Sequence, residues 1–138
     1  MSNITPARAA SLASMRAVET GDKAAWLALF APDACIEDPV GVSALDPAGE
    51  GHRGLDAIAA FWDANIGPNT LKFDIGRSHV AGDEVANVGT ITTTLPDGSQ
   101  AAVTGVFTYR VDAEGRLVSL RAFWNMDEDM EFTASEAG

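Results

Sequence analysis

The feature that most constrains the fold is a change of hydrophobic period halfway along the chain. Before residue 67, most apolar residues recur every three or four positions, the spacing of one helix face. After residue 69 they alternate with polar residues, the spacing of half-buried strands. Helices that precede a set of strands, rather than alternating with them, favour an α+β fold over a doubly wound α/β fold.

Capping residues delimit the helices that we expect. Thr5-Pro6 is typical of a helix N-cap and first residue, and Gly21 ends this first helix. Asp22 caps a second, short helix, whose apolar face includes Trp26 and Phe30. A short strand over 34–37 ends at a proline, since proline cannot donate to a strand ladder. A loop over 39–54 then leads to a third helix with its apolar residues at helical spacing.

Four segments with period two follow, and strong turn signals separate them. They are residues 71–80, 85–95, 100–111 and 117–125. We expect them to form an antiparallel meander that completes one domain over 1–125. Residues 126–138 hold five acidic residues and no basic residue, and we expect this tail to be frayed.

Composition excludes several classes of function. The 138 residues include 20 acidic and 9 basic ones, a net charge of −11, which argues against nucleic-acid and anionic-membrane partners. No apolar run is long enough to span a membrane. The single cysteine, Cys35, cannot form an internal disulfide, and we expect a buried thiol and a cytoplasmic protein.

Few motifs carry chemistry by themselves. The glycines form no phosphate-binding loop, and His52 and His79 lack the companions of a metal site, so we expect no metal. Glu37-Asp38-Pro39 places two acids at the end of a short strand, on backbone stiffened by the proline. Taken alone, this pair is either a solvated strand end or a carboxylate facing whatever the following loop encloses.

Longer segments resolve this ambiguity by resemblance. They are the Gly-Asp-containing segment 20–34, the motif Glu-Asp-Pro-Val-Gly at 37–41, the helix 51–62 and the final strands 109–124. Together they resemble the Δ5-3-ketosteroid isomerase branch of the NTF2-like (SnoaL-like) superfamily over residues 10–125. The most specific segment is the 37–41 motif, which keeps the family distance from Gly21-Asp22.

The resemblance implies a cone in which a strongly curved mixed or antiparallel sheet wraps around three helices and encloses a deep apolar pocket. It also implies that Asp38 is a general base that takes a proton from carbon beside a ketone and returns it elsewhere. The indole N–H of Trp124 would orient that carboxylate. We expect Trp26, Phe30 and Trp62 to line the substrate pocket as well.

The sequence departs from the family at the two groups that would stabilise the enolate oxygen. The family tyrosine falls on Ser14 and the family aspartic acid on Phe107. Tyr109 lies two residues from Phe107, so both side chains share a face and the phenol is a candidate replacement. Thr90 and Thr92 also alternate, and we expect them to make the pocket more polar.

Three functions remain open at this stage. The first is proton transfer by Asp38 on a hydrophobic, steroid-like ketone, without cofactor. The second is a non-catalytic pocket for an apolar ligand. The third is another NTF2-like reaction, such as dehydration, cyclisation or epoxide hydrolysis; the last needs an acid–arginine–acid arrangement, for which Arg121 with Asp38 is the one hint. The resemblance also implies a homodimer through the outer face of the sheet.

Overall fold

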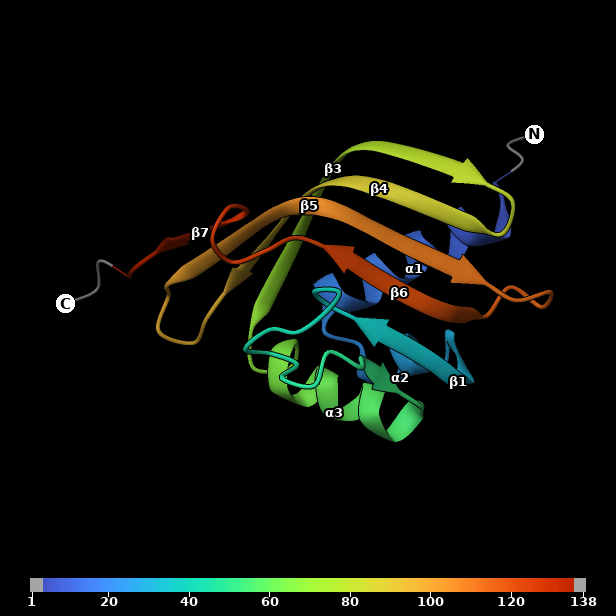
Figure 1. Cartoon of the computed structure of the whole chain (residues 1–138), viewed down its shortest axis with the longest axis horizontal. Coiled ribbons are helices and arrows are strands. Elements are labelled where there is room, and N and C mark those ends of the chain that lie inside the picture. Colours follow the sequence, from blue (N-terminus) through green and yellow to red (C-terminus); the bar gives the residue numbers. More distant parts are fainter. Residues whose placement is uncertain (1–3, 136–138) are drawn as a thin grey trace.

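The computed structural model describes residues 4–135, which form three helices and seven strands (Figure 1). In chain order these are α1 (Pro6–Thr20), α2 (Lys23–Leu27), β1 (Phe30–Glu37), β2 (His52–Arg53), α3 (Leu55–Asn65), β3 (Thr70–Ala81), β4 (Glu84–Thr94), β5 (Gln100–Val111), β6 (Leu117–Phe123) and β7 (Met130–Thr133). The α+β class that the period change predicts is therefore confirmed. None of the helices within the described residues is long and apolar enough to cross a membrane.

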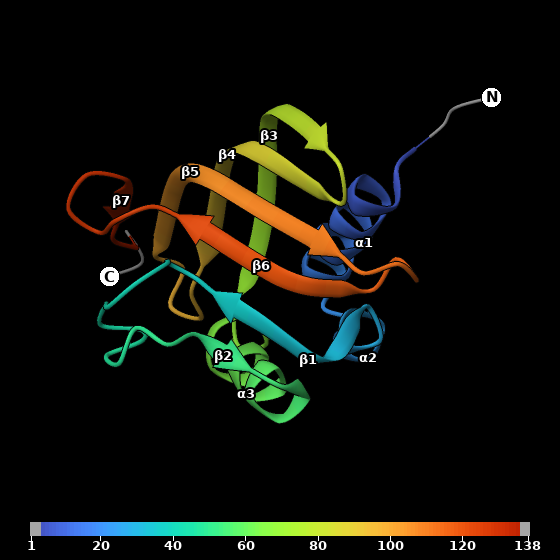
Figure 2. The same cartoon turned by 45° about the vertical axis from the view of Figure 1, so that its right-hand side comes forward.

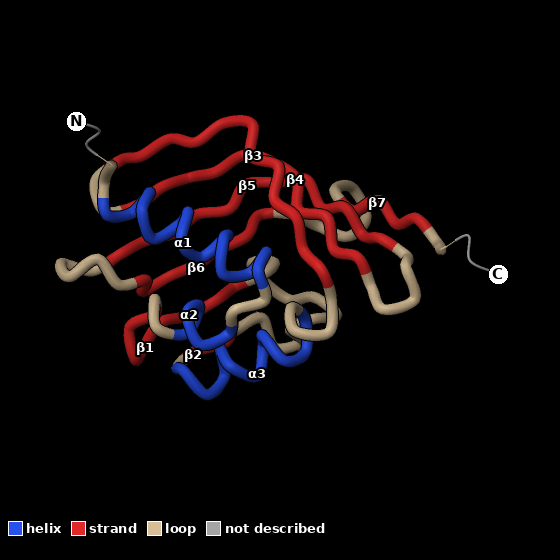
Figure 3. Tube along the Cα trace, turned by 180° about the vertical axis from the view of Figure 1, so that it is seen from behind, coloured by secondary structure: helices blue, strands red, loops and turns tan. Residues whose placement is uncertain are grey.

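The strands form one mixed sheet in the order β2-β1-β6-β5-β4-β3, and β7 pairs with the start of β5. All pairs are antiparallel except β1 with β6. The sheet bends strongly along its long strands (Figure 2). Seen from behind, α1 crosses the concave side of the sheet, and α2 and α3 lie at its lower end (Figure 3). The helices thus lie on the concave side of the sheet and at its lower end.

Local chemistry explains where the first two helices begin and end. Thr5 Oγ1 accepts a hydrogen bond from the Arg8 N–H at 3.3 Å, and Pro6 follows as the first helical residue. Gly21 ends α1 with a φ of 70°, a left-handed conformation that a residue with a Cβ avoids. Asp22 then accepts from the Ala25 N–H at 3.1 Å and starts α2.

The structure corrects two of the predicted boundaries. The second helix ends at Leu27, and Phe30 begins β1 opposite Leu117 of β6, because pairing with the buried β6 satisfies its backbone better than another helical turn. The acidic tail is not frayed along 130–133, since β7 pairs there with residues 100–103 of β5. The rest of the expected tail is described only to residue 135, and residues 136–138 lie outside the described part.

An aromatic cluster joins the helices to the sheet. The Trp26 ring lies 4.7 Å from the Phe30 ring and 5.1 Å from the Trp62 ring, measured between centroids. Trp26, Phe30 and Trp62 are all buried, as are Ile58 and Leu117 beside them. Burial of such large rings is a major source of stability, and it fixes α2 and α3 relative to β1.

Candidate active site

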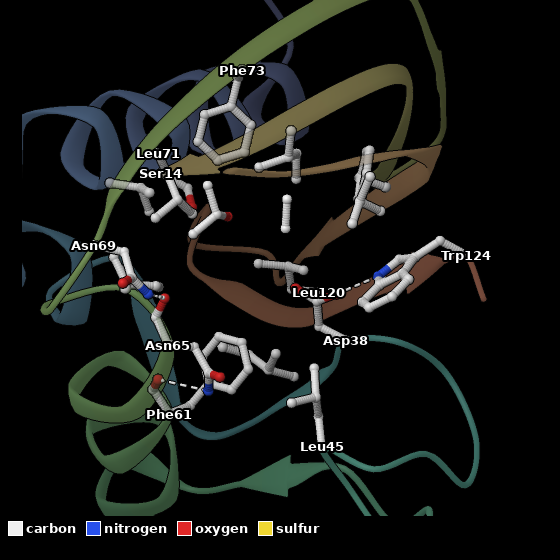
Figure 4. A pocket seen from close by; sticks show the side chains of 18 of the residues that line it. Ser14, Asp38, Leu45, Phe61, Asn65, Asn69, Leu71, Phe73, Leu120 and Trp124 are labelled. Carbon is white, nitrogen blue, oxygen red and sulfur yellow. Dashed lines mark hydrogen bonds between the residues drawn. The ribbon is translucent and has the colours of Figure 1, made fainter. Parts of the chain in front are cut away.

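The concave side of the sheet encloses a cavity of about 230 Å³, which is mostly apolar (Figure 4). Its apolar wall includes Val18, Ile36, Phe61, Ile66, Leu71, Phe73, Ile91, Val103, Phe107 and Leu120. Exposure shows its depth: Ser14 and Tyr109 are 1% and 3% exposed, whereas Leu45 at the other end is 42% exposed. Leu45, from the loop after β1, therefore lies at the mouth, and Ser14 and Tyr109 lie at the closed end.

Asp38 follows β1 directly and lies in the wall of this cavity. The Trp124 indole N–H donates a hydrogen bond of 2.7 Å to Asp38 Oδ1, as the resemblance predicted (Figure 4). Burial raises the pKa of the Asp38 carboxyl, and the Trp124 hydrogen bond and the charge of His52 lower it in part. Asp38 is therefore a carboxylate that Trp124 orients through its Oδ1 atom, and it is more basic than a carboxylate in water.

Glu37, the other acid of the motif, points away from the cavity. Its carboxylate pairs with Arg121 Nε at 3.1 Å, and neither residue lines the cavity. Neighbouring residues at a strand end point to opposite faces, which explains why the two adjacent acids have different surroundings. Arg121 is engaged with Glu37 rather than with Asp38, so the acid–arginine–acid arrangement of an epoxide hydrolase is not built on Asp38.

Tyr109 and Phe107 lie on the same face of β5, and both line the cavity, at its closed end. Burial raises the pKa of the Tyr109 phenol strongly, the nearby Asp38 raises it further, and a hydrogen bond from the Ser14 side chain lowers it. The phenol is therefore protonated near neutral pH. Tyr109 and Asp38 line the same cavity, and the negative charge of Asp38 acts electrostatically on the phenol.

Ser14 is the polar side chain next to Tyr109 in the cavity wall. The Trp26 indole, which can only donate, donates to Ser14 Oγ at 3.1 Å. With that hydrogen bond accepted, Ser14 Oγ still has its own proton to donate and one lone pair to accept, and it lies beside the Tyr109 phenol. When Ser14 donates to the Tyr109 oxygen, the phenolic proton of Tyr109 is left for a group inside the cavity.

Four of the predicted pocket residues lie elsewhere. Thr90 hydrogen-bonds to Thr104 at 2.8 Å on the outer face of the sheet, and neither Thr90 nor Thr92 lines the cavity. The neighbouring positions Ile91 and Thr93 line it instead, because a one-residue offset exchanges the two faces of a strand. Phe30 and Trp62 belong to the buried aromatic cluster behind Trp26, and only Trp26 of the three reaches the cavity.

The sequence reasoning missed several residues that line the cavity: Leu45, Asn65, Asn69, Thr93 and Met130. Asn65 follows Phe61 by one helical turn, and its amide donates to the Phe61 carbonyl at 3.1 Å. The four-residue spacing places Asn65 and Phe61 on one face of α3, so the helical period could have predicted that they line the same cavity. Met130 had no such signal, since it lies in the tail that we expected to be frayed.

Other groups in the described part of the chain offer no second reactive centre. Within residues 4–135, no group of three or more His, Cys, Asp and Glu side chains could hold a metal ion. Cys35 is 7% exposed, and burial raises the pKa of its thiol, which is the behaviour of a buried structural residue.

The sequence and the structure were compared with known protein families and solved structures. A SnoaL-like domain model matches residues 12–120. A steroid Delta-isomerase from Nocardioides simplex is 35% identical over 117 residues, 85% of this chain and 88% of that protein. The crystal structure of Delta 5-3-ketosteroid isomerase from Mycobacterium sp. matches with a TM-score of 0.91 and 46% identity, over 94% of this chain and 100% of that one.

A third similar structure is a complex with a ligand. RV0760c from Mycobacterium tuberculosis, in complex with estradiol-17beta-hemisuccinate, has a TM-score of 0.88 and 38% identity over 94% of this chain and 100% of that one. Together the matches show that the chain belongs to the SnoaL-like (NTF2-like) domain family and adopts its cone fold. Within that family it is similar to the Δ5-3-ketosteroid isomerases, so the resemblance found in the sequence is confirmed.

Proposed function

We propose that the protein catalyses an intramolecular proton transfer on a hydrophobic, steroid-like ketone, with Asp38 as the base and Tyr109 as the donor to the ketone oxygen. The observation that carries this proposal is the Asp38 carboxylate, held by Trp124 at 2.7 Å in the wall of an apolar cavity that also holds the Tyr109 phenol. A ligand in this cavity would be shielded from water, and shielding strengthens both the base and the donor.

The proposed reaction needs no oxidant, cofactor or net proton. The Asp38 carboxylate removes a proton from the carbon between a carbonyl and a carbon–carbon double bond. The electron pair left by that proton forms a dienolate, whose oxygen accepts a hydrogen bond from Tyr109. The neutral Asp38 then returns the same proton to the far carbon of the former double bond, and the product is the conjugated ketone.

The replaced donors set an expectation for the rate. Ser14 and Phe107 stand where the resemblance places the family tyrosine and aspartic acid, so Tyr109 would act alone. Each lost donor to an enolate-type oxygen costs roughly a hundredfold to a thousandfold in rate. We therefore expect slower turnover than in isomerases that keep both donors.

The second candidate is a binding protein for the same class of ligand. The complex of RV0760c with estradiol-17beta-hemisuccinate shows a similar protein with a steroid ligand, and binding alone would need no strong donor. An epoxide hydrolase is disfavoured by the pairing of Arg121 with Glu37 outside the cavity.

A pair of ligands separates catalysis from binding. The wild-type protein is given 5-androstene-3,17-dione, which has an acidic carbon beside its ring-A carbonyl, and the corresponding 3-hydroxy compound, which lacks that carbonyl. We expect both to bind and only the diketone to convert to a conjugated ketone, detected by its ultraviolet absorbance. Binding of both without conversion above the buffer rate would reject the enzyme and leave the binding protein.

We also infer that the protein is a cytoplasmic homodimer. The outer face of the sheet supports the dimer, because Val88, Val106 and Phe123 form a row across β4, β5 and β6. Val88 is 38% exposed and Phe123 is 41% exposed, so this apolar row is open to a second copy. The absence of a possible internal disulfide supports the location.

A further inference from the structure

Two amide side chains line the cavity apart from the candidate base and donor. Asn65 and Asn69 both lie in its wall, beside the apolar residues Phe61 and Ile66. In Figure 4 the Asn65 amide lies on the opposite side of the cavity from Asp38. A polar group in an apolar wall costs free energy when a ligand removes its water, unless the ligand offers a hydrogen bond in return. The proposed mechanism gives these two amides no role.

The strand register places the asparagines at the end of the cavity that is opposite to Tyr109. Asn69 directly precedes β3, and Leu71 of that strand pairs with Thr93 of β4. Thr93 pairs in turn with Ala101, near the start of β5, whereas Tyr109 lies near the other end of β5. A ligand whose ketone meets Tyr109 therefore extends its far end toward the asparagines.

Two hydrogen bonds fix the position of Asn65. Its Nδ2 donates to the Phe61 carbonyl at 3.1 Å, and its backbone carbonyl accepts from Asn69 Nδ2 at 2.9 Å. Because a carbonyl can only accept, the bond to Phe61 identifies which atom of the amide is the nitrogen. Within residues 4–135, Asn65 Oδ1 accepts no hydrogen bond. This acceptor and the second proton of Nδ2 are thus left for a ligand.

The end of α3 does not depend on the Asn65 side chain. The backbone N–H groups of Ile66 and Gly67 both donate to the Trp62 carbonyl, at 2.9 and 2.8 Å. Trp62 is buried in the aromatic cluster, so this last turn is fixed to the core. The backbone thus ends the helix, and a polar side chain on the cavity side at position 65 is explained by contact with a ligand.

We propose that Asn65 is a specificity-determining residue, whose Oδ1 accepts a hydrogen bond from a hydroxyl at the far end of the ligand. The preferred substrate class is then a steroid-like ketone with an alcohol at the end opposite to the reacting carbonyl. A hydroxyl can donate to Oδ1 and accept from Nδ2, whereas a second ketone can only accept and leaves Oδ1 without a partner. This inference deepens the proposed function and rests on it for the position of the reacting ketone.

Equilibrium binding of two conjugated ketones tests the proposal without any turnover. The compounds share ring A, but 17β-hydroxy-4-androsten-3-one has a hydroxyl at the far end and 4-androstene-3,17-dione has a ketone there. We expect the wild type to bind the hydroxyl compound about tenfold more tightly. Asn65→Leu keeps the size of the side chain without its hydrogen bonds, and should reduce this preference to about twofold or less. Gln100→Leu is the matched control, because it removes an exposed amide outside the cavity and should keep the preference.

The outcomes separate this inference from the proposed function. Equal affinity of the wild type for the two compounds would overturn the inference even if the isomerase activity is present, and this result needs no variant. A tenfold preference that survives in Asn65→Leu, or in Asn65→Ala if the first variant does not fold, would overturn it as well. A preference that depends on Asn65, in a protein that does not convert 5-androstene-3,17-dione, would reject the catalysis and keep the role of Asn65.

Discussion

At the scale of single residues, we expect turnover to depend most closely on the phenolic proton of Tyr109. Ser14 accepts from Trp26 and has one proton to donate to the Tyr109 oxygen, which would leave the Tyr109 proton for a ketone oxygen. We expect Tyr109→Phe to reduce kcat by about tenfold or more, because it removes a donor that acts in the transition state. Trp124→Phe is a useful comparison, since it disturbs the base instead. An unchanged kcat with a changed melting temperature would make Tyr109 a structural residue.

The raised pKa of Asp38 also predicts how stability depends on pH. Burial favours the neutral form in the folded state, so the ionised carboxylate destabilises the fold above its folded-state pKa. This cost disappears below the ordinary Asp pKa of 3.8, where both states are protonated. We therefore expect Asp38→Asn to melt a few degrees higher than the wild type at pH 7, with a difference that shrinks toward pH 4. A difference that does not change with pH would contradict this account.

At the scale of elements, β4 provides a test in two adjacent residues. Thr93 lines the cavity, whereas Thr92 does not and lies on the other face of the strand. We expect Thr93→Val to tighten binding of an apolar polycyclic ligand a few-fold, because a buried methyl replaces a hydroxyl in an apolar wall. Thr92→Val, the matched control, should leave the dissociation constant unchanged. The opposite pattern would place the strand in the wrong register.

The elements were predictable to different degrees, for physical reasons. Caps such as Thr5 and Gly21 act locally, so the sequence alone predicted both ends of α1. The alternation along β4 predicted that Thr90 and Thr92 share a face, but the face that meets the cavity depends on pairing with β3 and β5. The pairing of β7 with β5 is likewise a tertiary contact, and its acidic sequence carries no signal for it.

In the candidate site too, the residues in local motifs were predictable, and those placed by tertiary contacts were not. Asp38, Ser14, Phe107 and Tyr109 were found because they sit at recognisable positions of a motif or of a strand period. His52 was noted only as a histidine without metal-ligand companions. Its pairing with Ile36 of β1 arises from the two-residue strand β2, which is too short for a hydrophobic period to reveal.

At the scale of the whole molecule, the apolar row across the outer sheet predicts a second copy. Arg121 lies over the Phe123 ring, 5.2 Å from its centroid, so an exposed aromatic is presented rigidly on this face. We expect a dimer in sedimentation velocity, and Phe123→Glu should shift it to monomer by placing charge in the contact. Leu12→Glu on α1, where Leu12 is 50% exposed, is the matched control and should remain dimeric. A monomeric wild type would reject the dimer.

The most direct test of the whole account is the turnover of Asp38→Asn on 5-androstene-3,17-dione, with ligand affinity measured in the same samples. Asparagine keeps the shape of the side chain and an acceptor for Trp124, but it cannot take a proton. Glu37→Gln is the matched control, because Glu37 is the adjacent acid and points out of the cavity toward Arg121. We predict that Asp38→Asn loses turnover by at least about a hundredfold while binding its ligand as well as the wild type, and that Glu37→Gln stays active. Turnover by Asp38→Asn within threefold of the wild type would contradict the assignment of Asp38 as the base.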